Sequence, residues 1–194
     1  MALNESAEEM MATIREGNRT ALLIVDMQVH VIDSAWKEGT VIENTRLALK
    51  KARERGIPVI WIQHVNQKLV PGSSGWQIIP PLEPLPNEIQ IEKHFNSAFE
   101  ETDLENTLAR LNITHIVLAG VLTNWCIQST AYAALDKGYD LTLIEDAHTT
   151  DDFELDNGET IKATQIIQAF NITIGGLRYP GRTNRVISVD ELAF

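Results

Sequence analysis

Apolar runs that are typical of buried strands alternate with apolar positions at helical spacing along most of the chain. One continuous apolar run ends in the carboxylate of Asp26, as expected for a strand of a parallel sheet. Apolar residues at helical spacing follow in the segment that ends at Gly56, and glycine is typical of helix C-termini. We therefore expect strands at residues 20–26, 57–63, 88–93, 115–119, 139–145 and 185–189, and helices at 41–56, 102–111, 124–137 and 160–170.

The segments outside these elements carry weaker signals. Ser6 and Glu9 form a capping-box pattern, which predicts a short N-terminal helix that reaches about Arg15. Five prolines stand between the second and third expected strands, so we expect that stretch to be irregular. Residues 171–184 are rich in glycine, and we expect them to form a loop that covers a ligand site or reaches a neighbouring subunit.

The order of these elements predicts the fold class. Alternating strands and helices form a parallel sheet with helices on both faces, an α/β three-layer sandwich. A chain of 194 residues is long enough for one well-buried domain and short for two, so we expect a single domain over 1–194. Ligands bind such sheets outside the carboxyl ends of the strands. Asp26, Lys93 and Cys126 all stand at or just after those expected ends.

Composition and charge narrow the choice of partners. The chain is 44% hydrophobic and 22% charged, as in ordinary globular proteins. Its formal net charge of −11 argues against nucleic acid and anionic membranes as partners. The sequence has no apolar run of membrane-spanning length, no signal-peptide pattern at 1–17, and a single cysteine that cannot form an internal disulfide. We therefore expect a cytoplasmic protein that acts on a small molecule.

Cys126, the single cysteine, lies between an expected strand and an expected helix. At such a turn, free backbone N–H groups and the positive end of the helix dipole favour a thiolate. A thiolate beside unpaired N–H groups is the arrangement that an acyl-transfer nucleophile needs. The alternative is a small buried hydrophobic residue, which is the role of most lone cysteines.

Three motifs in this order resemble the isochorismatase-like cysteine hydrolases. This superfamily includes nicotinamidases, carbamoylsarcosine amidohydrolases, and biuret or ureidoacrylate hydrolases. The motifs that carry the resemblance are Asp26-Met27-Gln28, residues 92–99 with Lys93, and residues 120–126 ending in Cys126. The resemblance extends over about residues 20–146.

The resemblance implies a fold and a site. The fold is a six-stranded parallel sheet with the Rossmann-like strand order 3-2-1-4-5-6. The site is an Asp–Lys–Cys triad, carried here by Asp26, Lys93 and Cys126. A cis peptide between Val121 and Leu122 is implied as well. Members of the family are commonly homo-oligomers, so we also expect a dimer or a tetramer.

The three residue types suit the hydrolysis of an amide. An amide carbonyl is a poor electrophile, so it needs a strong nucleophile and donors for the developing oxyanion. Cys126 would attack, Asp26 would move the thiol proton to the leaving nitrogen, and Lys93 would hold positive charge beside both. The resemblance adds the N–H groups of Leu122 and Cys126 as oxyanion donors. Ordinary alternatives remain, since Asp26 can cap a loop, Lys93 can be a solvated rim charge, and Thr123 is expected to cap the helix.

The metal site of nicotinamidases is not present in this sequence. That site has the pattern Asp-x-His with a second His nearby, whereas residues 63–66 contain His64 without either partner. Zinc normally needs at least three protein ligands, so we expect neither a metal nor another cofactor. Isochorismatases proper hydrolyse a vinyl ether and typically lack the cysteine, so Cys126 favours C–N hydrolysis. A vinyl ether hydrolase and a non-catalytic binding module on the same fold are the remaining alternatives.

The segment expected to form the pocket rim is poor in cations. No arginine occurs between Gly56 and Ala109, and Lys68 and Lys93 are the lysines of that segment. Recognition of a carboxylate-rich substrate normally uses a bidentate arginine. We therefore expect a small neutral or cationic amide or ureide as the substrate.

Eight side chains near the expected strand ends are candidates for substrate contacts. Three are tryptophans, which suit the wall of a pocket for a cationic or planar group but equally suit cover for loops or a subunit interface. His115 stands at the opposite end of the sheet and is expected to be structural, and His148 is assigned no role. The candidates are Gln28, His30, Trp36, His64, Trp76, His94, Phe99 and Trp125.

Overall fold

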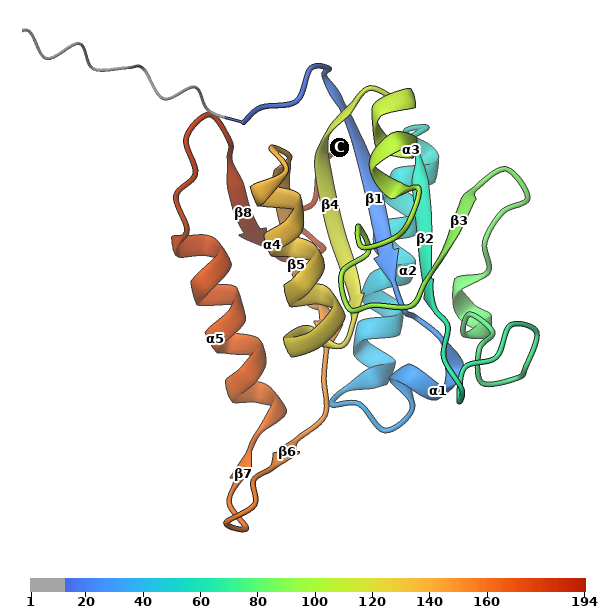
Figure 1. The fold of residues 1–194 in the computed structure, drawn as a ribbon, viewed down its shortest axis with the longest axis vertical. Helices are drawn as coiled ribbons and strands as arrows, with labels where there is room; N and C mark the ends of the chain where they lie inside the picture. The colour runs from blue at the N-terminus through green and yellow to red at the C-terminus, as the bar shows by residue number, and fades with distance from the viewer. Residues whose placement is uncertain (1–12) are drawn as a thin grey trace, which may run out of the picture.

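A six-stranded parallel sheet forms the centre of the protein (Figure 1). The computed structural model describes residues 13–194, and the strand order is β3-β2-β1-β4-β5-β8. Each neighbouring pair is parallel. With β8 counted as the sixth strand, this confirms the expected order. The strands are β1 (Arg19–Val25), β2 (Val59–His64), β3 (Ile89–Lys93), β4 (Ile113–Val121), β5 (Asp140–Thr149) and β8 (Asn184–Ile187).

Helices cover both faces of the sheet, as the alternating pattern predicts. On one face, α2 (Glu38–Glu54) buries Val41, Ala48 and Leu49, and the short α1 (Val29–Ile32) lies beside it. Figure 1 shows α2 behind the sheet and α4 and α5 in front of it. The helices of the second face are α3 (Leu104–Arg110), α4 (Gln128–Asp136) and α5 (Ala163–Gly176).

The central strand β1 anchors the core. Every residue from Ala21 to Val25 is fully buried, with side chains alternating between the two helical layers. Full burial of each large aliphatic side chain stabilises the fold by about 1.5–3 kcal/mol. Asp26 directly follows this strand, so the buried strand fixes its position. It lies at the edge of the sheet where the parallel strands end, which we call the carboxyl edge.

The start of the helix expected at 124–137 differs from the prediction. Residues Thr123–Ile127 form a π-helical turn, η2, and α4 begins only after it. The proline-containing stretch is irregular as expected, apart from the short 3-10 turn η1 (Pro80–Leu82). The N-terminal helix expected from Ser6 lies outside the described residues up to residue 12, and residues 13–15 are not helical.

The expectation of a loop over residues 171–184 that covers the site is wrong. The helix α5 continues to Gly176, so the connection to β8 is only residues 177–183. In that connection, the Thr183 N–H donates to Asp140 Oδ1 over 2.6 Å, and Asp140 is the first residue of β5. The loop therefore lies at the opposite edge of the sheet, the amino edge.

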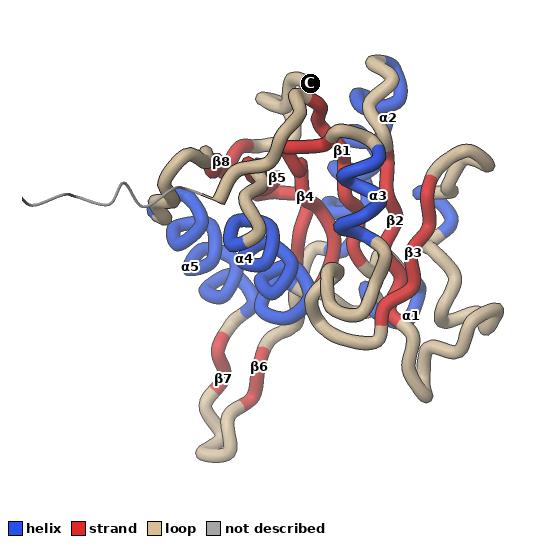
Figure 2. The backbone as a smooth tube through the Cα atoms, turned by 45° about the horizontal axis from the view of Figure 1, so that its top comes forward, coloured by secondary structure: helices blue, strands red, loops and turns tan. Residues whose placement is uncertain are grey.

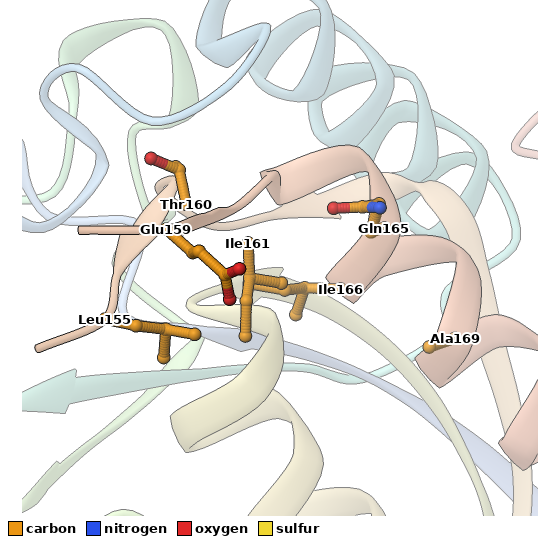
Figure 3. A pocket seen from close by; sticks show the side chains of 7 residues that line it. All are labelled: Leu155, Glu159, Thr160, Ile161, Gln165, Ile166 and Ala169. Carbon is orange, nitrogen blue, oxygen red and sulfur yellow. The ribbon is translucent and has the colours of Figure 1, made fainter. Parts of the chain in front are cut away.

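A short hairpin after β5 was not predicted. Its strands, β6 (Phe153–Glu154) and β7 (Thr160–Ile161), pair antiparallel and project beyond the body at the carboxyl edge (Figure 2). A hollow lies between this hairpin and α5 (Figure 3). Of its lining residues, Glu159 is the ionisable one, so this hollow lacks the groups that hydrolysis needs. The lining consists of Leu155, Glu159, Thr160, Ile161, Gln165, Ile166 and Ala169.

Gly120 allows β1 and β4 to approach each other at the carboxyl edge. Its φ is +131°, and a Cβ at this position would lie 2.0 Å from the carbonyl oxygen of Val25. Only glycine fits here, because both the backbone conformation and the space exclude a side chain. Among residues 13–194, every helix is too short or too polar to cross a membrane.

We predict that Gly120→Ala lowers the free energy of unfolding by at least about 3 kcal/mol, because the added methyl group meets the backbone of the central strand. Urea denaturation measures this. The control is Gly39→Ala, since a Cβ at Gly39 would meet nothing within 4 Å. A loss below about 1 kcal/mol for Gly120→Ala would contradict the close approach.

Candidate active site

Asp26 stands at the carboxyl edge, directly after β1. Its side chain is fully buried, its φ is 53°, and its backbone N–H donates to the carbonyl oxygen of Ile62 over 2.9 Å. A non-glycine residue in this left-handed region carries strain of order 1–3 kcal/mol, which is found mostly at functional sites. Oδ1 of Asp26 is buried and has no hydrogen-bond partner within residues 13–194, so it is available to accept a proton.

Lys93 is the last residue of β3 and is fully buried. Its ammonium group lies 2.7 Å from Asp26 Oδ2, 3.2 Å from Cys126 Sγ, 3.0 Å from His64 Nδ1 and 3.2 Å from the carbonyl oxygen of Phe95. A buried ammonium needs this many polar partners, because each lost water costs solvation energy. The structure thus brings the three predicted triad residues into direct contact.

Cys126 lies in the η2 turn that follows β4. The peptide bond between Val121 and Leu122, at the start of this turn, is cis, as the resemblance implies. The cysteine is 8% exposed and forms no disulfide. Its sulfur therefore lies at the carboxyl edge within reach of both charged side chains.

The surroundings of Cys126 favour a protonated sulfur in the free site. Burial, followed by the nearby carboxylate of Asp26, raises the pKa of the Cys126 thiol to about 12, although the Lys93 ammonium acts in the opposite direction. The helix end and the Lys93 ammonium are expected to favour a thiolate, but in the structure burial and the Asp26 carboxylate outweigh them and shift the thiol pKa upwards.

His64 joins the triad from the end of β2. Its ring is half-buried, and burial, followed by the charge of Lys93, lowers the pKa of His64. The ring is therefore neutral at neutral pH, and its Nδ1 can accept a hydrogen bond from Lys93. Of the predicted contact residues, His64 is the one whose side chain lies within hydrogen-bond distance of a triad side chain.

Asp26, His64 and Cys126 also include three donor atoms within 4.8 Å of one another, a spacing that could suit a metal ion. The Lys93 ammonium contacts all three of these side chains. A metal bound here would have to displace or neutralise that ammonium, so the donor set fits a cation poorly while Lys93 is charged. The expected absence of a metal stays a prediction.

Gln28 has a structural role in this edge of the sheet. Its amide nitrogen donates to the carbonyl oxygens of His64 and Trp76 over 3.0 and 2.9 Å, and its amide oxygen accepts from the His64 N–H over 2.7 Å. The residue is fully buried. Gln28 thus joins the ends of β1 and β2 and leaves no polar atom for a substrate.

Phe99 is not brought to the triad. Its ring centroid lies 5.8 Å from that of Tyr139, which precedes β5 at the amino edge. Since β4 runs nearly the whole width of the sheet before Cys126, this places the Phe99 ring at the far end from the sulfur. Phe99 is packed against the core, which periodicity alone could not reveal.

The other candidates surround the carboxyl edge at different places. Trp125, directly before Cys126, is 46% exposed, and Trp36 lines a hollow with Ser34, Asp151 and Asp152. The remaining positions are the Trp76 ring in a hollow beside Gln63 and Gln90, His94 with Nδ1 3.2 Å from the Val65 carbonyl oxygen, and His30 on the surface beside Gly75.

His115 and His148 both form contacts with threonines, and the contact of His148 is the fully buried one of the two. His115 Nε2 lies 2.8 Å from Thr142 Oγ1 near the amino edge, in keeping with its expected structural role. His148 Nδ1 lies 2.9 Å from Thr123 Oγ1, in the turn that carries Cys126. Sequence reasoning missed His148, because only the irregular pairing of β5 with β4 places it there.

Comparison with known proteins agrees with this geometry. Residues 20–174 match the isochorismatase domain, so the chain belongs to the isochorismatase-like hydrolases, the family that its motifs resemble. A crystal structure of an isochorismatase from Pseudomonas putida KT2440 superposes with a TM-score of 0.81 at 29% identity and covers 90% of both chains.

Two curated relatives carry named activities. Streptothricin hydrolase from Streptomyces noursei is 31% identical over 164 residues, which are 80% of this chain and 65% of that protein. Ureidoacrylate amidohydrolase from Cronobacter sakazakii is 27% identical over 172 residues, which are 66% of this chain and 74% of that protein. The chain thus spans just under two thirds of the length of the streptothricin hydrolase.

We predict that Asp26→Asn speeds the alkylation of Cys126 by iodoacetamide at pH 8 by at least about tenfold, because loss of the carboxylate lowers the thiol pKa. Mass spectrometry follows the reaction. The wild-type protein unfolded in urea supplies the rate of an ordinary thiol, and we expect the folded wild type to react more slowly than this reference. Unchanged or slower alkylation of Asp26→Asn would contradict the placement of the proton.

Proposed function

We propose that this protein is a cysteine hydrolase that cleaves the C–N bond of a small amide or ureide through a thioester at Cys126. The observation that carries the proposal is the mutual contact of Lys93 with Asp26 Oδ2 and Cys126 Sγ. Nucleophile, base and positive charge thereby meet at one point of the carboxyl edge, where sheets of this class bind ligands.

The first half of the reaction forms the thioester. As Cys126 Sγ attacks the carbonyl carbon, its proton passes to Asp26, and the carbonyl π electrons move to oxygen. The N–H groups of Leu122 and Cys126 are the proposed donors to this oxyanion, each contributing on the order of 3 kcal/mol. When the oxyanion collapses, the C–N bond breaks and the Asp26 proton goes to the leaving nitrogen.

The second half releases the acid. Asp26, again a carboxylate, takes a proton from a water molecule that attacks the thioester carbonyl. Collapse of the second oxyanion breaks the C–S bond, and the sulfur regains its proton from Asp26. Lys93 stabilises negative charge first on the Asp26 carboxylate and then on the Cys126 sulfur, because its ammonium group lies between the two.

The proposed reaction needs no metal, since the Lys93 ammonium supplies positive charge at the point where the donor atoms converge. The names of two relatives, a streptothricin hydrolase and a ureidoacrylate amidohydrolase, support the class of reaction but not a substrate for this chain. Association into a dimer or tetramer stays a prediction from the resemblance, which sedimentation tests.

Acidic groups near the site favour a neutral or cationic substrate. The hollow lined by Trp36 includes Asp151 and Asp152. Because Asp152 forms an ion pair with Lys162 over 2.8 Å, Asp151 is the carboxylate that carries the effect of charge here. The neighbouring Thr150 donates through Oγ1 to Asn124 Oδ1 over 2.6 Å, so these carboxylates adjoin the turn that carries Cys126. With a formal net charge of −11, the protein repels anionic substrates.

We predict that Cys126→Ala lowers C–N hydrolysis at least about 1,000-fold, because it removes the nucleophile. Release of ammonia or amine from a panel of small amides and ureides measures this. Lys93→Met should also abolish turnover, whereas Glu54→Gln, a charge change at the end of α2, should not. If the wild type hydrolyses no member of the panel and Cys126→Ala retains full activity on isochorismate, vinyl ether hydrolysis replaces this proposal.

We also predict that a cationic methanethiosulfonate modifies Cys126 faster than an anionic one by at least about tenfold, after normalisation to a free thiol. The acidic surroundings concentrate the cation, so added salt reduces this ratio. Asp151→Asn should lower the ratio, while Glu54→Gln, which removes an equal charge at the amino edge, should leave it unchanged. Equal rates for both reagents would contradict the proposed substrate charge.

A further inference from the structure

A chain of three polar side chains, which begins at the half-buried Asn171, leads from α5 to the turn that carries Cys126. His148 Nε2 lies 2.9 Å from Asn171 Oδ1, and His148 Nδ1 lies 2.9 Å from Thr123 Oγ1. Thr123 and His148 are almost fully buried. The triad does not include these residues, and no step of the proposed reaction uses them.

The hydrogen bonds fix the direction of each proton. Asn171 Oδ1 is an amide oxygen and can only accept, so it accepts the hydrogen of His148 Nε2, while the Asn171 amide nitrogen lies 3.5 Å from the carbonyl oxygen of Glu145. His148 Nδ1 is then an acceptor, and it receives the hydroxyl proton of Thr123. Burial lowers the pKa of His148 to about 4, which keeps the ring in this neutral form. The Phe170 ring packs edge-on against the His148 ring, with the two ring centroids 5.9 Å apart.

The path of β5 brings His148 to this place. In its pairing with β4, Leu143 lies opposite Leu118, but His148 lies opposite Gly120, so β5 has three more residues than β4 over this interval. The bulge carries the ring to the start of η2. Two residues later, Thr150 Oγ1 donates to Asn124 Oδ1, so the end of β5 holds the turn at two successive residues.

We propose that His148 is a positioning residue, which holds η2 through Thr123 so that Cys126 Sγ stays beside Lys93 and Asp26. The inference rests on the proposed function, in which Cys126 is the nucleophile. A π-helical turn has poorer packing than an α-helix and is often found at functional sites, so it needs outside support. The His148 imidazole is neutral and both of its nitrogens are hydrogen-bonded, so the ring is held in one orientation and fixes the position of Thr123.

A second threonine–histidine pair provides a matched comparison. Thr142 Oγ1 lies 2.8 Å from His115 Nε2, and Thr142 is fully buried like Thr123. This pair joins β5 to β4 near the amino edge and touches no residue of η2. Loss of either hydroxyl removes one histidine contact of similar length, but only one of the two reaches the cysteine turn.

The test compares Thr123→Val with Thr142→Val by the alkylation of Cys126 with iodoacetamide at pH 9, below both melting temperatures. If Thr123 holds the turn, its loss lets the sulfur leave Asp26 and its buried place. The thiol pKa then falls towards its ordinary value, and the rate rises at least about tenfold. In Thr142→Val, Cys126 should be alkylated at the wild-type rate, even if the melting temperature of this variant falls as far as that of Thr123→Val.

A pair of His148 variants separates positioning from packing. Asn can offer an acceptor near the position of Nδ1, whereas Gln offers its amide nearer to Nε2, so only His148→Asn keeps the bond to Thr123. We expect His148→Gln to show fast alkylation and reduced turnover, and His148→Asn to lie closer to the wild type in both.

Wild-type protection of Cys126 in Thr123→Val and His148→Gln would overturn the proposal, as would equal acceleration in Thr142→Val. The alkylation rates do not depend on C–N hydrolysis. Failure of the wild type to hydrolyse any amide would therefore count against the proposed function alone, and it would leave the comparison of the variants intact.

Discussion

The buried ion pair between Lys93 and Asp26 is the interaction on which the rest of the site depends. Two charges without exposure are costly to remove from water, and their 2.7 Å contact offsets this cost only while both remain in place. Removing one partner of such a pair typically costs about 3–5 kcal/mol. The two residues end β3 and follow β1, which are separated by β2, so the pair exists only if the sheet has this strand order.

The same pair sets the chemistry of the cysteine. Burial and the Asp26 carboxylate raise the pKa of the thiol while Lys93 lowers it, and the balance favours a protonated sulfur. The nearby Asp26 Oδ1 has no hydrogen-bond partner among residues 13–194. In the proposed reaction, Cys126 therefore stays unreactive until a substrate enters and the proton moves to Asp26. Besides the contact of Cys126 with Lys93, the turn that carries the cysteine is hydrogen-bonded to His148 and Thr150 at the bulged end of β5.

The sequence allowed the triad to be predicted, because Asp26, Lys93 and Cys126 stand at strand ends that apolar runs reveal. Other features depend on tertiary contacts that no local pattern carries. The direction of the Cys126 pKa shift follows from burial and from Asp26, a residue 100 positions away in the chain. Gln28 and Phe99 fit a pocket by type, yet hydrogen bonds and ring packing give them structural roles. The extension of α5 into a glycine-containing segment contradicts local propensity. The β6–β7 hairpin, by contrast, has a local signal that the sequence prediction missed, because Asn157-Gly158 stands between its two short strands.

The most direct test of the central claim is a crystal structure of the protein soaked with a small aldehyde. We expect a covalent bond from Cys126 Sγ to the former carbonyl carbon of the aldehyde. The new oxygen should face the N–H groups of Leu122 and Cys126, with Lys93 still in contact with Asp26. An unmodified Cys126 with the aldehyde bound elsewhere, or a Lys93 side chain turned away from Asp26 and the sulfur, would contradict the central claim.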